Sequence, residues 1–132
     1  MLKLIDWREI IAELELTAHY HNALVLPPVY GAYCGDMMSD VLARARRGSL
    51  WITIQRHRNV IAVASLVGLS AVVISGGRVP PPDTVALAEK EGVPLFSTPL
   101  DSFHAAGRLY YLLTRVGLIN PTADGVAKPQ NT

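Results

Sequence analysis

The chain has 132 residues, of which 50% are hydrophobic and 17% are charged, and its formal net charge is +1. This length favours one domain with a hydrophobic core of its own, and the near-neutral charge argues against nucleic acid or an anionic membrane as a partner. The single cysteine, Cys34, excludes an internal disulfide framework and favours a reducing, cytoplasmic location.

The N-terminal segment predicts a helix and then an irregular stretch. Asp6 is placed to cap a helix over residues 7–14, with Glu9 as its reciprocal partner and Ile5 and Ile10 as a hydrophobic staple. The acidic residues of this segment are unlike a signal peptide. Residues 16–25 alternate only loosely between polar and apolar side chains, which predicts a strand followed by a turn.

The next unit is a strand over residues 29–33 and a helix that we expect to start after Asp36 as its cap and to reach Arg46. Met38, Val41, Leu42 and Ala45 have the spacing of one apolar helix face. Arg44, Arg46 and Arg47 crowd the end of this helix before Gly48, the expected left-handed stop. Such a cluster is more often a solvated helix end than a phosphate-binding patch, and both readings stay open.

The centre of the chain predicts a parallel crossover. Residues 50–54 and 71–74 are rich in β-branched side chains, and the apolar run 60–67 between them predicts a helix closed by Gly68. The apolar run from residue 60 to 73 is interrupted by Gly68 and two serines, so it falls short of a membrane span.

The last third predicts a helix over residues 83–91 that begins at the prolines 80–82, a strand over 93–97, and a helix to about Leu113. Thr98, Pro99 and Asp101 are spaced as the cap of that last helix. Its inner stripe is expected to hold Phe103, Ala106, Tyr110 and Leu113. The whole pattern predicts an α/β fold in which one domain, residues 1–119, has a mostly parallel sheet of about five strands with helices on both faces, and residues 120–132 form a mobile tail.

In such a fold, ligands tend to bind beyond the carboxyl ends of the parallel strands. Small or hydrogen-bonding residues follow each predicted strand here, and helix N-termini lie close by. We therefore predict one ligand-binding cleft at this edge, although the same residue types also serve as caps and turns. Its predicted members are Asp36, Thr53, Gln55, His57, Ser75, Gly76, Gly77 and Thr98.

Other candidate sites are weaker. The chain has neither of the two common glycine-rich nucleotide-binding fingerprints, and His19 and His21 lack a nearby third ligand, so no metal or cofactor is expected. Asp36 raises rather than lowers the pKa of the Cys34 thiol, so Cys34 is not an activated nucleophile. The residues suggest no catalytic triad or paired acid and base.

Several segments together resemble stand-alone DRTGG-domain proteins. They are residues 31–41, residues 50–55 with His57 and Asn59, residues 74–77 and residues 94–98. The resemblance spans about Tyr30 to Tyr111 and places the family's glycine pair at Gly76 and Gly77. Related domains occur as regulatory units in some phosphate acetyltransferases and CBS-containing pyrophosphatases, and as the N-terminal part of HPr kinase/phosphorylase. The resemblance implies a small α/β module, commonly dimeric and without catalysis of its own.

Two functions follow as alternatives. The first is a non-catalytic regulatory or assembly module that forms a homodimer, senses a small anionic ligand such as a nucleotide or phosphorylated metabolite, and acts on a metabolic enzyme. The second is a small enzyme acting on a phosphorylated or nucleotide substrate at the same strand ends. The dimer is expected because the helix over residues 60–67 is apolar almost all round, so a second copy would cover it.

Overall fold

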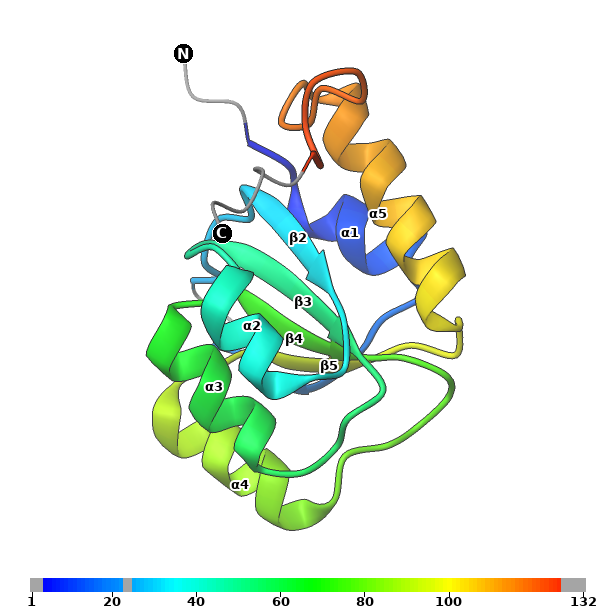
Figure 1. Ribbon diagram of the computed structural model, residues 1–132. Helices are drawn as coiled ribbons and strands as arrows, with labels where there is room; N and C mark the ends of the chain where they lie inside the picture. Colours follow the sequence, from blue (N-terminus) through cyan, green and yellow to red (C-terminus); the bar gives the residue numbers. More distant parts are fainter. Residues whose placement is uncertain (1–3, 23–24, 127–132) are drawn as a thin grey trace, which may run out of the picture.

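Five strands form one sheet in the order β1-β5-β4-β3-β2, and helices cover both of its faces (Figure 1). The computed structural model describes residues 4–22 and 25–126. This arrangement confirms the predicted α/β class. The elements in chain order are α1 (Trp7–Glu13), β1 (Thr17–Tyr20), β2 (Gly31–Cys34), α2 (Met38–Arg44), β3 (Ser49–Thr53), α3 (Asn59–Val67), β4 (Ala71–Ile74), α4 (Pro82–Glu91), β5 (Leu95–Ser97) and α5 (Ser102–Arg115).

Strands β2, β3, β4 and β5 run parallel to one another, and β1 pairs antiparallel with β5 at one edge. The central crossover agrees with the sequence, because β3, α3 and β4 follow one another as strand, helix and strand. At the other edge, β2 pairs with β3, and within the described residues its outer side has no strand partner. A free edge exposes backbone N–H and C=O groups to whatever lies beside it.

The sheet separates two hydrophobic cores because successive side chains of a strand point to opposite faces. On one face, Leu50 and Ile52 of β3 pack with residues of α1 and α5, such as Ile10 and Leu109. On the other face, Trp51 packs with residues of α2, α3 and α4. Figure 1 shows this division, with α1 and α5 on one side of the sheet and α2, α3 and α4 on the other.

The start of α1 follows its local sequence. The Asp6 side chain accepts a hydrogen bond from the N–H of Arg8 at 2.8 Å, which confirms the predicted cap. Ile5 and Ile10, the predicted staple, are both buried in the same core. The strand predicted within residues 16–25 is β1, whereas residues 23 and 24 lie outside the described part.

The caps predicted for α2 and α5 are wrong. Met37 rather than Asp36 precedes α2, and α2 ends at Arg44 rather than Arg46. Gly48, with φ of +81°, lies in the loop to β3, where its N–H donates to the carbonyl of Gly68 at 3.0 Å. At α5 the cap is Asp101, which accepts from the N–H of His104 at 2.8 Å. In each case, hydrogen bonds to a distant segment replace the local arrangement that the sequence suggested.

The predicted inner stripe of α5 is also partly wrong. Phe103 is 81% exposed and Tyr110 is 45% exposed, whereas Ala105 and Leu109 are buried with Leu113. The buried face is therefore rotated from the predicted one and is formed by Ala105, Leu109, Leu112 and Leu113. As a result, α5 turns aromatic side chains outward.

Residues 120–126, which the sequence assigned to a tail, form a turn in which Asp124 accepts from the N–H of Asn120 at 2.7 Å. Residues 127–132 lie outside the described part. Among the described residues, no helix has both the length and the apolar character that crossing a bilayer requires.

We expect Thr98→Val to lower the free energy of unfolding by about 1–3 kcal/mol, the usual cost of a lost buried hydrogen bond. The Thr98 hydroxyl donates to the carbonyl of Leu14 at 2.5 Å and accepts from the N–H of Leu100 at 3.2 Å. Urea unfolding measures the change. Thr98→Ser keeps the hydroxyl and is the control, and equal stability of the valine variant and the wild type would contradict the assignment.

Candidate functional site

The carboxyl ends of the parallel strands lie at one edge of the sheet, as the predicted cleft requires. Thr53 at the end of β3 accepts from the N–H of Ser75 at 2.9 Å, and Thr98 after β5 accepts from the N–H of Gly77 at 3.0 Å, both through backbone carbonyls. Thr53 and Gly76 therefore lie at the same end of the sheet. Binding a ligand there requires polar groups that have no partner within the fold.

Asp36 holds the ends of two strands together. Its carboxylate accepts from the hydroxyl of Thr53 at 2.9 Å and from the N–H of Ile54 at 3.0 Å, and its carbonyl accepts from the amide of Gln55 at 3.2 Å. Because β2 and β3 are adjacent and parallel, Asp36 lies against the end of β3 and not over the start of α2. Asp36, Thr53 and Gln55 are thus one network, and its first role is structural.

The glycine pair also uses its donors within the fold. Gly76 and Gly77 have φ of +80° and +72°, which glycine adopts without strain. The N–H of Gly76 donates to the carbonyl of Leu100 at 2.7 Å, and that of Gly77 donates to Thr98. Both N–H groups therefore have hydrogen-bond partners within the fold.

The other predicted members are similarly engaged. Ser75 and Ser102 share a hydroxyl–hydroxyl hydrogen bond of 2.6 Å, and Thr98 bonds toward α1. The His57 ring accepts from the N–H of Asn59 at 3.1 Å at the start of α3, while the rest of the ring is exposed. Most hydrogen-bonding groups of the eight predicted residues thus stabilise turns and caps.

His19 in β1 and His21 just after it have separate partners in the structure. His19 forms a 2.7 Å hydrogen bond with the hydroxyl of Ser97, whereas His21 stacks on the ring of Phe96. Within the described residues, no group of three or more His, Cys, Asp or Glu side chains has a geometry for a metal ion. Partial burial and then the charge of Asp36 raise the pKa of Cys34, as expected for a thiol that is not activated.

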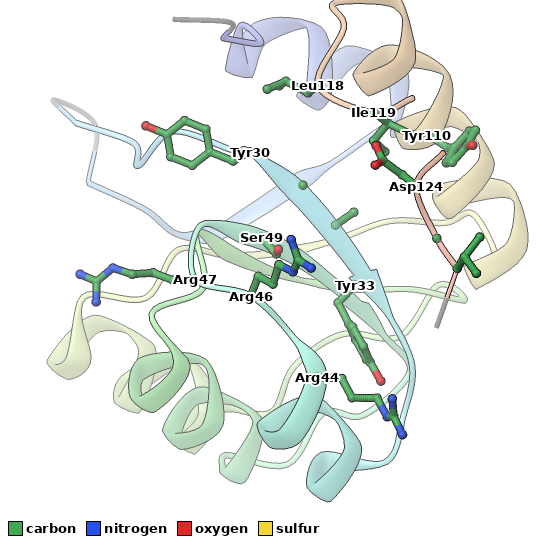
Figure 2. Close-up of a pocket in the computed structure, with 14 residues that line it drawn as sticks. Tyr30, Tyr33, Arg44, Arg46, Arg47, Ser49, Tyr110, Leu118, Ile119 and Asp124 are labelled. Atoms are coloured by element: carbon green, nitrogen blue, oxygen red, sulfur yellow. The ribbon is translucent and has the colours of Figure 1, made fainter. Parts of the chain in front are cut away.

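A cavity of about 780 Å³ lies elsewhere, along the outer side of β2 (Figure 2). The arginines at the end of α2 form one wall, and α5 with the segment that follows it forms the other. Its size is within the usual range for small-molecule sites. It is lined by Tyr30, Gly31, Ala32, Tyr33, Arg44, Arg46, Arg47, Ser49, Tyr110, Leu118, Ile119, Asp124, Gly125 and Val126.

The sequence did not reveal this cavity, although the arginine cluster was its one visible signal. The three arginines differ in their surroundings. Arg44 pairs with Asp40 at 2.9 Å, and Arg47 packs near Gly68. Within the described residues, Arg46 has no hydrogen-bond or ion-pair partner for its guanidinium. Within the described residues, the cluster thus contains one paired arginine, Arg44, and two arginines without an ion-pair partner, Arg46 and Arg47.

The fold defines a small α/β module whose strand-end polar residues hydrogen-bond to neighbouring loops. The DRTGG domain model matches residues 29–112, and the chain belongs to this family. The match confirms the resemblance found in the sequence. It includes β2 to β5 and the helices between them, but it leaves out α1 and β1.

One solved structure similar to this chain contains the CBS and DRTGG domains of the regulatory region of Clostridium perfringens pyrophosphatase, in complex with the activator diadenosine tetraphosphate. The match has a TM-score of 0.64 and 20% sequence identity, and it covers 83% of this chain. It covers 46% of that chain, so the protein described here spans about half its length. At this identity the likeness concerns the fold. The comparison with curated proteins finds no match.

We expect Tyr33→Phe to raise the pKa of Asp40 toward its ordinary value of 3.8, because the Tyr33 hydroxyl donates to this carboxylate and, with Arg44, lowers its pKa. The same bond raises the pKa of Tyr33. Carboxyl-carbon NMR titration measures the Asp40 change, and Tyr30→Phe is the control.

The stability effect has a defined sign. Because the pKa of Asp40 is lowered, the hydrogen bond from Tyr33 stabilises the fold fully above the pKa of an unfolded aspartate, about 3.9. This stabilisation is lost as the pH falls through the pKa that Asp40 has in the folded protein. Because the pKa of Tyr33 is raised, the same hydrogen bond stabilises the fold fully below about pH 10, the pKa of an unfolded tyrosine. This stabilisation is lost as the pH rises through the pKa that Tyr33 has in the folded protein. An unchanged Asp40 titration in Tyr33→Phe would contradict the assignment.

Proposed function

We propose that this chain is a non-catalytic regulatory module that forms a homodimer and senses a small anionic ligand, a nucleotide or a phosphorylated metabolite. The match to the DRTGG domain over residues 29–112 is the observation that carries the proposal. A protein of the same fold, the pyrophosphatase regulatory region, binds a nucleotide activator, which supports the choice of ligand class.

The strand-end geometry supports a binding role over an enzymatic one. Asp36, Thr53 and Gln55 bond one another, and Ser75 bonds Ser102, so these groups are held in place by the fold. The contact of Ser97 with His19 joins a hydroxyl to an imidazole, but no carboxylate among the described residues orients that ring. A nucleophile with an oriented base is the arrangement that hydrolytic enzymes need.

The partner and the compartment follow from the same proposal. A regulatory module needs an enzyme to regulate, and we propose a metabolic enzyme as the partner. We place the protein in the cytoplasm on the basis of its single cysteine. That the eight strand-end residues contact the ligand stays a prediction, and variants of Gln55 and His57 test it below.

We expect a nucleotide or phosphorylated metabolite to raise the melting temperature of the protein. A ligand at a hundred times its Kd stabilises the folded state by about 2.7 kcal/mol. Thermal-shift measurements with AMP, ADP, ATP, GTP and sugar phosphates check this, and the matching nucleosides and free sugars are controls. If no phosphorylated compound shifts the melting temperature, the sensing function is wrong.

We place the dimer interface on the outer face of α5. Phe103 and Tyr111 are 81% and 60% exposed there, and Gly107 between them leaves room for close approach. Aromatic residues are enriched at protein interfaces. On α3, which the sequence favoured, Val60, Ile61, Val63 and Ala64 are buried within the chain, and Leu66 is its one large exposed apolar residue.

We therefore expect Phe103→Glu to convert the dimer into a monomer, because burying a carboxylate against a second copy is unfavourable. Sedimentation velocity over micromolar dilutions measures the mass. Leu66→Glu, at a residue of 79% exposure, is the matched control and should remain dimeric. A monomeric wild type would contradict the dimer, and the reverse response of the two variants would move the interface to α3.

A further inference from the structure

We propose that the cavity beside β2 binds a nucleoside phosphate, with Arg46 and Ser49 holding the phosphate. This inference rests on the proposed sensing function, and it places the ligand away from the predicted strand-end cleft. The residues that carry it come from the loop between α2 and β3, the outer side of β2, and the segment after α5.

Ser49 supplies the strongest observation. The residue is only 6% exposed, and within the described residues its hydroxyl has no hydrogen-bond partner. Its backbone is fully used, because its N–H donates to the carbonyl of Arg46 at 3.1 Å and its carbonyl accepts from Ser70 at 2.9 Å. Ser49 lines the cavity, and its hydroxyl oxygen is not among the fully buried unpaired atoms of the described residues, so the cavity gives access to it. A ligand oxygen in the cavity would accept a hydrogen bond from this hydroxyl.

Arg46 brings the charge. The turn that joins its carbonyl to the N–H of Ser49 fixes the two residues next to each other. Figure 2 shows the Arg46 side chain extending toward Ser49, whereas Arg47 extends away from it. The guanidinium is unpaired within the described residues, while neighbouring Arg44 is neutralised by Asp40. An unpaired arginine next to a hydroxyl donor matches the oxygens of a phosphate, which accept hydrogen bonds and carry negative charge.

The wall opposite the arginines is mostly apolar and would contact the base of the nucleotide. Tyr110, Leu118 and Ile119 present aromatic and aliphatic surface, which suits a flat base. Asp124 lies on the same wall and accepts from the N–H of Asn120 through one oxygen, so its other oxygen is free to accept from an amino group. A phosphate would be repelled by Asp124 and attracted by Arg46. A ligand with a phosphate at one end and a base bearing hydrogen-bond donors at the other therefore fits both walls.

The test is isothermal titration of the full chain with AMP, ATP and inorganic pyrophosphate. We expect AMP or ATP to bind, and Arg46→Ala to weaken the binding about tenfold or more, as for loss of a charge-assisted hydrogen bond. Arg58→Ala, which removes an exposed arginine near the strand-end cleft, is the matched control and should change the Kd less than about twofold.

Gly31→Ala gives a second, independent variant. A Cβ at Gly31 would lie 3.5 Å from the Ser49 hydroxyl oxygen, an ordinary contact, and this glycine has no positive φ. The new methyl group is therefore compatible with the fold but covers the hydroxyl on its cavity side, and we expect weaker nucleotide binding with an unchanged melting temperature of the free protein.

The outcomes separate the two proposals. If Arg46→Ala and Gly31→Ala bind nucleotide like the wild type while Gln55→Ala or His57→Ala loses binding, the cavity assignment is wrong and the sensing function stands at the strand ends. If pyrophosphate binds with the same Kd as the nucleotides, the base-binding role of Tyr110, Leu118 and Ile119 is wrong. If none of the three probes binds the wild type, this inference fails, and the sensing function then depends on the sugar phosphates of the thermal-shift panel.

Discussion

The burial of β3 on both faces is the constraint on which the rest of the structure depends. All of Ser49–Thr53 is buried, and its side chains enter both cores. Such a strand is stable only if helices cover each face of the sheet, which the crossovers between parallel strands provide. The buried Trp51 adds a polar constraint, because its indole N–H donates to the carbonyl of Gly35 at 2.8 Å and fixes the end of β2.

Because the edge strand β2 is aligned by that central strand, its outer side is presented in a fixed position. Helices α1 and α5 cover one face of the sheet, and α2, α3 and α4 cover the other (Figure 1). The cavity lies along the β2 edge and is lined by residues of α5, of the segment after it, and of the end of α2 (Figure 2). The residues at the strand ends form hydrogen bonds between neighbouring loops. Asp36, for example, joins the end of β2 to the end of β3. Hydrogen bonds within the chain thereby close the strand ends, whereas Arg46 and the Ser49 hydroxyl beside β2 have no side-chain partner among the described residues.

The sequence predicted what depends on nearby residues. Hydrophobic patterns located the strands and helices, and Asp6 was a correct cap because its partner, Arg8, is two residues away. Asp36 and Thr98 were wrongly predicted to be helix caps. Their hydrogen-bond partners, Thr53 and Leu14, lie far away in the sequence and come close only in the folded chain. The cavity escaped prediction for the same reason. One of its walls includes residues 124–126, which have no apolar period, and the free hydroxyl of Ser49 becomes evident only when its surroundings are known.

The contact between α1 and the end of β5 has a consequence for the order of folding. Thr98 meets Leu14 across 84 positions of sequence, and the pairing of β1 with β5 closes a similarly long loop. Contacts between distant parts of a chain carry a larger entropic cost of loop closure and tend to form late. The crossovers of residues 29–112 can therefore assemble first, and the N-terminal helix and strand then dock onto Phe96. This last step completes the core that contains α1 and adds β1 to the edge of a sheet whose other four strands are already paired.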